Sequence, residues 1–273
     1  MLTKRVISCL DVRDGKLAKS IQFQGTIDIG DPVEKAHQYY EAGLDELVFY
    51  DITASHEGRG IILDVVRRVA AQVFIPFSVG GGLRTVADAG RVLEAGAEKV
   101  NYNSGAVERP EVLEEAARAF GAQAVVLSMD VLRTPATPQL PSGFEVVTHG
   151  GRKRRGIDAI EWARRAEQLG AGEIVVNSID ADGTRQGYDV ALTRQIADAV
   201  SLPVIASGGG GECEHLREVL SEGHADAALV ASMLHYGSHT VAEIKNYLSG
   251  HGLPIRSSPP AFSPRLPRSL SAK

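Results

Sequence analysis

The amino-acid sequence predicts an α/β protein with the fold of a (β/α)8 TIM barrel, built from two half-barrel repeats. The chain has 273 residues, and 44% of them are hydrophobic, which is enough for one large core. Barrels of this kind occupy about 250 residues as a single domain. Short apolar runs alternate along the chain with longer segments of helical period, which is the pattern of parallel βα units.

Eight short apolar runs are the predicted strands. They cover residues 6–10, 47–50, 77–79, 100–102, 124–129, 174–177, 204–206 and 227–230. Eight strands that alternate with helices in a chain of this length favour a closed barrel over an open sheet.

The ends of several predicted helices carry residues that suit those positions. Asp31 is a good N-cap and Pro32 fits the first helical position, while Thr85 and Asp88 flank another helix start. A glycine follows each of five helical segments, where a left-handed C-terminal cap is expected. These glycines are Gly43, Gly96, Gly121, Gly170 and Gly223.

The chain resembles itself at a nearly constant spacing, which predicts two half-barrels of four βα units each. Glu46 corresponds to Glu173 (173−46=127), and Gly96 corresponds to Gly223 (223−96=127). Only the segment 133–155 breaks the rhythm, because it holds extra prolines and an alternating run at 144–148. We expect an inserted loop or hairpin there.

Residues 1–256 are expected to form the barrel, and residues 257–273 a separate tail. The tail is rich in proline and serine and has no apolar period. A segment of that composition cannot bury enough surface to offset its ordering entropy, so we expect it to be disordered.

Composition and charge exclude several classes of function. The formal net charge of −5 argues against nucleic acid or an anionic membrane surface as the main partner. No apolar stretch approaches the roughly 18 residues that span a bilayer, and the N-terminus does not resemble a signal peptide. The two cysteines, Cys9 and Cys213, do not form a disulfide framework, which favours a reducing, cytoplasmic compartment.

Two aspartates are the candidate catalytic residues. Asp11 and Asp130 each follow the first predicted strand of a half-barrel, and TIM barrels build their active sites at such strand ends. Opposed carboxyl groups can act as general acid and general base if their surroundings separate their pKa values. A single aspartate there could equally cap a loop or a helix, but the matched pair favours function.

Two glycine clusters predict a pair of phosphate sites. Residues 80–82 follow the third strand and residues 208–211 follow the seventh. Backbone N–H groups exposed by glycines before a helix bind anions well, although tight turns alone could explain one such cluster. The candidate substrate-binding residues at these and the neighbouring strand ends are Gly82, Asn103, Ser104, Asp182, Gly183, Thr184, Gly209, Ala231 and Ser232.

The remaining polar residues give weaker indications. Lys19 lies in the first βα loop, at residues 15–30, where a cation could clamp an anionic substrate on closure or could simply be solvated. The histidines show no metal-ligand spacing, and Cys9 is better explained as a core thiol than as a nucleophile. We expect neither a metal nor a cofactor.

These residues belong to motifs that resemble one known family along residues 4–256, the cyclase subunits of imidazole glycerol phosphate synthase. The motifs begin at Cys9 (CLDVRDG), Asp45 (DELVFYDITAS), Ser78 (SVGGG), His149 (HGGRK), Asp180 (DADGT) and Val204 (VIASGG). The resemblance implies that a separate glutaminase subunit forms a heterodimer with the chain and supplies ammonia. The ammonia would convert the bisphosphorylated substrate PRFAR to imidazole glycerol phosphate and AICAR in histidine biosynthesis.

The resemblance also assigns residues to roles. It implies that Asp11 and Asp130 are the catalytic pair and that Lys19 is the loop lysine. It also implies that the phosphate contacts are Gly82, Asn103, Ser104, Gly183, Gly209, Ala231 and Ser232. It further implies an ammonia gate of four charged residues at the barrel floor. These are Arg5, Glu46, Lys99 and Glu173.

Three positions depart from the family's usual residues, and two other functions compete with the cyclase. Ser8 stands where proline is usual, Gly105 replaces a small residue other than glycine, and Gly210 replaces alanine. One competitor is the related isomerase barrel, against which the four gate residues argue. The other is a non-cyclising paralogue that conducts ammonia for a sugar-modifying amidotransferase, against which retention of Asp11 and Asp130 argues.

Overall fold

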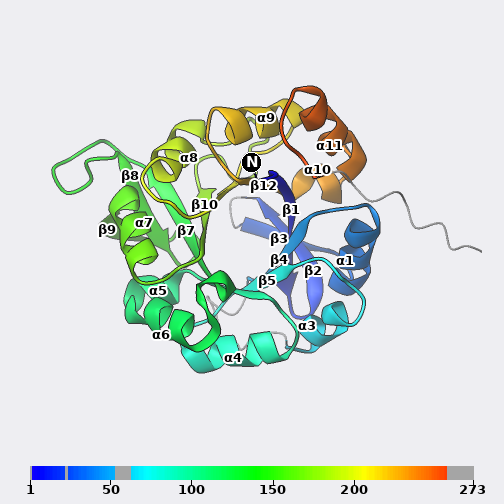
Figure 1. Cartoon of the computed structure of the whole chain (residues 1–273), viewed down its shortest axis with the longest axis horizontal. Coiled ribbons are helices and arrows are strands. Elements are labelled where there is room, and N and C mark those ends of the chain that lie inside the picture. Colours follow the sequence, from blue (N-terminus) through cyan, green and yellow to red (C-terminus); the bar gives the residue numbers. More distant parts are fainter. Residues whose placement is uncertain (1, 22–23, 53–62, 257–273) are drawn as a thin grey trace, which may run out of the picture.

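The computed structural model describes residues 2–21, 24–52 and 63–256, with no side chains described at residues 19–29. Eight parallel strands form a closed barrel within this part of the chain (Figure 1). These strands are hydrogen-bonded in the order β10, β11, β12, β1, β4, β5, β6 and β7, and the pairing of β10 with β7 closes the barrel. The barrel strands are β1 (Arg5–Arg13), β4 (Glu46–Asp51), β5 (Phe77–Gly80), β6 (Lys99–Tyr102), β7 (Val125–Arg133), β10 (Glu173–Ser178), β11 (Val204–Ser207) and β12 (Ala227–Val230).

Helices surround the strands as an outer ring (Figure 1). The predicted (β/α)8 barrel is thereby confirmed. The helices are α1 (Pro32–Glu41), α3 (Leu63–Ala70), α4 (Val86–Glu94), α5 (Ser104–Glu108), α6 (Glu111–Phe120), α7 (Ala159–Gln168), α8 (Val190–Ala197), α9 (Cys213–Ser221), α10 (Ser232–His235) and α11 (Val241–Gly250), with a short 3-10 turn at Ala122–Ala124.

The helix starts follow the predicted caps. The carboxylate of Asp31 accepts hydrogen bonds from the backbone N–H groups of Val33 and Glu34 at the start of α1. Thr85 and Asp88 form a reciprocal capping box at the start of α4. Such caps satisfy backbone donors that have no partner within the helix.

Four of the five predicted C-terminal glycines adopt a positive φ, but Gly223 does not. Gly43, Gly96, Gly121 and Gly170 have φ between 82° and 113°. After α9 the left-handed residue is His224, with φ 56°. A Cβ atom at Gly223 would lie 2.5 Å from the carbonyl oxygen of Val219, so close approach, rather than backbone conformation, requires glycine there.

The core has two parts because strand residues alternate between the two faces of the barrel wall. The larger part lies between strands and helices and includes Leu10, Leu47 and Phe77. The smaller part fills the barrel interior and includes Ile7, Val48 and Leu229.

Two hairpins extend from the barrel at equivalent places in the two halves. β1 continues past the barrel and pairs with β2 (Lys16–Ile21), which pairs with β3 (Gln24–Gly30). β7 likewise pairs with β8 (Phe144–Thr148), which pairs with β9 (Lys153–Asp158). The loop or hairpin expected within 133–155 is a hairpin, and its last strand continues to Asp158. The loop expected at 15–30 is corrected, because strands occupy much of it.

The predicted strands agree with the observed ones to within a few residues. The largest differences are at β1 and β7, which run three and four residues further than predicted, to Arg13 and Arg133. No helix in the described residues is long and apolar enough to cross a membrane. The tail expected at 257–273 lies outside the described residues.

Candidate active site

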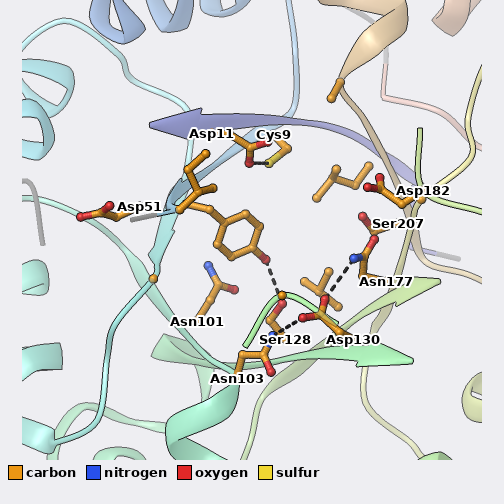
Figure 2. A pocket seen from close by; sticks show the side chains of 18 of the residues that line it. Cys9, Asp11, Asp51, Asn101, Asn103, Ser128, Asp130, Asn177, Asp182 and Ser207 are labelled. Carbon is orange, nitrogen blue, oxygen red and sulfur yellow. Dashed lines mark hydrogen bonds between the residues drawn. The ribbon is translucent and has the colours of Figure 1, made fainter. Parts of the chain in front are cut away.

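A pocket opens at the carboxyl ends of the barrel strands, where the predicted site residues were expected to meet (Figure 2). Both candidate catalytic aspartates line it, and Figure 2 shows Asp11 and Asp130 on opposite sides. Other predicted residues in its lining are Gly82, Asn103, Ser104, Asp182, Gly183, Gly209, Ala231 and Ser232.

Two predicted residues stand apart from that set. Thr184 is exposed, does not line the pocket, and donates its hydroxyl to the carbonyl oxygen of Ala181 at 2.7 Å. Lys19 lies in β2, on the hairpin that follows Asp11. Its side chain is outside the part of the chain that the structure describes.

Asp130 is buried and held by two asparagines. Asn103 donates its Nδ2 to Oδ2 of Asp130 at 3.0 Å, and Asn177 donates its Nδ2 to Oδ1 at 3.0 Å. These asparagines come from β10 and from the end of β6, the two barrel strands that flank β7. The carboxyl group is therefore fixed in orientation from both sides (Figure 2).

Burial raises the pKa of Asp130, and the hydrogen bonds from Asn177 and Asn103 offset only part of that effect. Burial penalises the charged form, whereas hydrogen bonds from amide donors stabilise it. A carboxyl group with a raised pKa can hold or take up a proton closer to neutral pH, as general acid–base catalysis requires.

Asp11 has different surroundings, although it occupies the corresponding place on β1. It is half-buried, and its Oδ1 accepts a hydrogen bond from the thiol of Cys9 at 3.3 Å. Cys9 is buried in the barrel interior, as predicted, and it also lines the pocket. The two carboxyl groups thus face one pocket from unlike environments.

The glycine turns beside the pocket are related by the half-barrel repeat. Gly81 and Gly208 both have positive φ, 98° and 90°, and are 208−81=127 residues apart. A Cβ atom would meet the backbone oxygen of Asp51 in the first case and of Ser178 in the second, again 178−51=127 residues apart. Both turns therefore require glycine for two reasons, close backbone approach and left-handed conformation.

Beside each glycine turn in the pocket lining lies the first residue of a short helix from the next βα unit. Ser104 begins α5 and Ser232 begins α10. The hydroxyl oxygen of Ser104 accepts a hydrogen bond from the backbone N–H of His149 at 3.1 Å, so the β8–β9 hairpin contacts this side of the pocket. The hydroxyl proton of Ser104 can still be donated to an anion.

The sequence interpretation missed several polar residues in the pocket. These are Tyr50, Asn101, Ser128 and Asn177 and the three arginines Arg84, Arg152 and Arg185. Asn177 directly opposes Asp130 in the parallel pairing of β10 with β7, a register that the apolar pattern of the sequence does not specify. The arginines lie on loops, whose positions depend on tertiary packing.

The four predicted gate residues meet at the opposite end of the barrel. Each is the first residue of its strand. Arg5 donates to Glu46 at 2.7 Å and also to Glu173, while Lys99 donates to both glutamates at 2.8 Å. The four side chains therefore form a closed ring of alternating charge, which we call the charged ring.

Both cations of the charged ring remain protonated. Burial alone would lower the pKa values of Arg5 and Lys99, but the nearby carboxylates of Glu46 and Glu173 outweigh it and raise both. Glu46 and Glu173 are themselves buried. Charges in such a position are tolerated only when they are paired.

Two of the unusual residues named above fit close contacts in this chain. A Cβ atom at Gly210 would lie 2.5 Å from the hydroxyl oxygen of Tyr188, a buried side chain that donates to the carbonyl oxygen of Leu229 at 3.0 Å. A Cβ atom at Gly105 would meet the carbonyl oxygen of Leu83. Ser8 is fully buried in β1.

Comparison with known proteins agrees with the predicted family. A family model described as "Histidine biosynthesis protein" matches residues 5–240. A protein of Desulfovibrio desulfuricans is 62% identical over 256 residues, which cover 94% of this chain and 99% of the relative. Proteins of Desulfosudis oleivorans and Oleidesulfovibrio alaskensis are 61% and 60% identical over 256 residues, with the same coverage. All three relatives are named imidazole glycerol phosphate synthase subunit HisF. The chain belongs to the family of histidine biosynthesis proteins that contains these synthase subunits.

Proposed function

We propose that this chain is the cyclase subunit of imidazole glycerol phosphate synthase, a lyase of histidine biosynthesis that converts PRFAR and ammonia to imidazole glycerol phosphate and AICAR. One observation carries the proposal beyond family membership. Asp11 and Asp130 face each other across a pocket whose two sides carry repeat-related glycine turns. A substrate with a phosphate at each end fits such a site, because its reacting carbons would lie between the carboxyl groups.

The chemistry needs proton transfer at two stages. Ammonia adds to the carbonyl carbon of the substrate, whose oxygen takes up protons and leaves as water. The nitrogen that came from ammonia then closes the ring by forming a C–N bond to the carbon that holds AICAR. The bond between that carbon and the AICAR nitrogen breaks, and the departing nitrogen must receive a proton. Two carboxyl groups with unlike surroundings can supply and remove these protons. Asp130, with its raised pKa, suits one role, and Asp11 the other.

The phosphate groups would bind at the two repeat-related sides of the pocket. On one side Gly82 and Ser104 offer backbone N–H groups and a hydroxyl, and on the other Gly209 and Ser232 offer the same. We propose that Asn103, Asp182, Gly183 and Ala231 complete these contacts. Thr184 and Lys19 stay proposed contacts, and for Thr184 the contact requires its loop to move toward the substrate.

The charged ring supports a role for the other end of the barrel. We propose that a glutaminase subunit docks there in the cytoplasm, forming a heterodimer, and that its ammonia passes the ring and travels through the barrel interior. The alternative of a non-cyclising ammonia conductor gains no support from the relatives, which carry the synthase name.

An assay of ring closure with PRFAR and an ammonium salt, without any partner, tests the proposal. We expect imidazole glycerol phosphate and AICAR to form in equal amounts. Asp130→Asn is the matched control, because it keeps the shape of the side chain and removes its acid. Intact, folded protein that yields no product with saturating ammonium would contradict the proposal.

Anion binding tests the two phosphate sites separately. Crystals grown with sulfate should contain one ion near Gly82 and Ser104 and another near Gly209 and Ser232. Sulfate found only at the charged-ring end of the barrel would contradict this part of the proposal.

A further inference from the structure

The fourth strands of the two half-barrels, β6 and β12, correspond to each other, but β6 lines the barrel interior with polar side chains and β12 lines it with apolar ones. On β6 the inward residues are Lys99, Asn101 and, just past the strand, Asn103. The equivalent residues of β12 lie 128 positions later and are Ala227, Leu229 and Ala231 (227−99=128). A polar column therefore runs from the charged ring to Asp130 on one strand, opposite an apolar column on its counterpart.

The spacing of the polar column suits transfer from the ring to the pocket. Successive inward residues on a strand are about 7 Å apart, so Lys99 and Asn103 span about 13 Å with Asn101 midway. Lys99 belongs to the charged ring, and Asn103 donates to Asp130. Asn101 connects the two ends but contacts neither group in the hydrogen bonds of the described residues.

Asn101 carries an acceptor that lacks a partner. Its Nδ2 donates to the hydroxyl oxygen of Ser78 at 2.9 Å, which fixes the orientation of the amide. Its Oδ1 is buried and has no hydrogen-bond partner among the described residues, and the residue is only 2% exposed. In Figure 2 the amide points toward the middle of the pocket. Buried carbonyl oxygens without a donor are costly and rare in native proteins.

We propose that the amide oxygen of Asn101 accepts a hydrogen bond from ammonia inside the barrel, after ammonia has passed the charged ring and before it reaches the substrate. The inference rests on the proposed function, because it assumes that ammonia crosses the barrel. Ammonia carries three N–H donors, so it can satisfy an acceptor that this pocket leaves open. The neighbouring acceptor, Oδ1 of Asn103, also lacks a partner among the described residues and is the next position along the column.

Substitutions at Asn101 test the role of the acceptor against that of shape. Asn101→Leu installs the residue that occupies the equivalent position of β12, with similar size and no acceptor. Asn101→Ala removes the acceptor and leaves space. Asn101→Ser keeps an acceptor oxygen on a smaller side chain.

The measurement is the amount of imidazole glycerol phosphate formed per glutamine hydrolysed, in the complex reconstituted with the glutaminase. Loss of one hydrogen bond predicts a drop of about tenfold in this ratio for both Asn101→Leu and Asn101→Ala. With ammonium as the nitrogen donor, the same variants should be affected less. The fold-decrease in their turnover should be at most about one third of the fold-decrease in the glutamine-dependent ratio. Asn101→Ser should stay within about threefold of the wild-type ratio.

Leu229→Ala is the control on the apolar column, and it should leave the ratio unchanged because no acceptor is lost. The proposal is wrong if Asn101→Ala forms as much imidazole glycerol phosphate per glutamine as the wild type. A loss seen only in Asn101→Leu would then be explained by the shape of the side chain alone. It is also wrong if glutamine and ammonium turnover fall equally. A wild-type protein that makes no product from ammonium would instead contradict the proposed function.

Discussion

The two half-barrels present their aspartates in the same frame but surround them with different side chains. On β10, Asn177 directly opposes Asp130, and the equivalent residue opposite Asp11 on β4 is Tyr50 (177−50=127). On the other flank, Asn103 beside Asp130 corresponds to Ala231 beside Asp11 (231−103=128). Two amide donors in one half are thus replaced by a phenol and a methyl group in the other.

The difference teaches how a duplicated frame can carry two chemical roles. The repeat fixes where each carboxyl group lies, because both aspartates leave the barrel at the start of a hairpin. The neighbouring side chains then set burial and hydrogen bonding, which decide when each carboxyl group releases its proton. Asp130 is buried with two amide partners, whereas Asp11 is half-buried beside the thiol of Cys9.

Replacing either aspartate should have the largest effect on activity. Asp11→Asn and Asp130→Asn each remove one member of the acid–base pair, and we expect ammonium-dependent turnover to fall by about 10²–10⁴. The measurement is steady-state turnover of PRFAR with saturating ammonium. Because the two half-barrels have unequal surroundings, the two losses should differ in size and in pH dependence.

The unfolding midpoint of each variant serves as the control, because asparagine keeps the shape of the side chain. We expect Asp130→Asn to be at least as stable as the wild type, since it removes a carboxyl group whose charged form is penalised by burial. Near wild-type turnover in either variant would show that the residue has no catalytic role.

The sequence was sufficient for the fold and for the residues that repeat. Asp11, Asp130 and the glycine turns lie at corresponding strand ends of the two half-barrels, and strand ends are visible as the limits of apolar runs. The charged ring was predicted from the family resemblance instead, because Lys99 has no charged counterpart at Ala227. Asn177 and Tyr50 were missed because their importance depends on the register between neighbouring strands. Apolar periodicity does not specify that register.

Local backbone details were predicted less well, for a related reason. The repeat implied that Gly223 would end α9 as Gly96 ends α4, but the loop after α9 has one extra residue, and His224 adopts the left-handed conformation instead. That extra residue changes the repeat spacing from 127 to 128 between Gly223 and Ala227. The strands of the first hairpin, β2 and β3, were read as a loop because they pair with each other and with the end of β1, outside the repeated pattern of parallel βα units.

Removing Lys99 should have the next largest effect, and it should depend on the nitrogen donor. Its equivalent on β12 is Ala227, so Lys99→Ala makes the two strands alike at the floor. We expect product formed per glutamine to fall by about tenfold, which a change of about 1.4 kcal/mol in the transfer barrier would cause. Ammonium-dependent turnover should fall much less, because added ammonium can reach the open pocket directly.

The other cation of the charged ring, Arg5, helps to separate an effect of Lys99 on ammonia transfer from an effect on protein stability. Lys99→Ala leaves Arg5 as the partner of both Glu46 and Glu173, so part of the pairing survives. Lys99→Arg, which restores the second cation, should recover part of the product formed per glutamine. Equal losses with glutamine and ammonium would mean that Lys99 supports folding or substrate binding, and the gate hypothesis would fail.

Removing one amide donor beside Asp130 should have the smallest effect, seen in the pH profile more than in the maximal rate. The hydrogen bond from Asn177 lowers the pKa of Asp130 and partly offsets burial. Asn177→Ala should therefore raise that pKa further. If Asp130 donates a proton, the alkaline limb of ammonium-dependent kcat moves to higher pH, and if it accepts one, the acidic limb moves to higher pH.

The direction of the shift is the same in both cases, so the limb that moves identifies the role of Asp130 while the upward movement tests the physical cause. Tyr50→Phe is the matched control from the other half-barrel, because the hydroxyl of Tyr50 is hydrogen-bonded to Ser128 at 3.0 Å and not to Asp130. It should leave the limb attributable to Asp130 in place. A downward shift in Asn177→Ala, or equal shifts in the two variants, would mean that the asparagines do not set the proton affinity of Asp130, and the contrast between the half-barrels would then have to arise from burial alone.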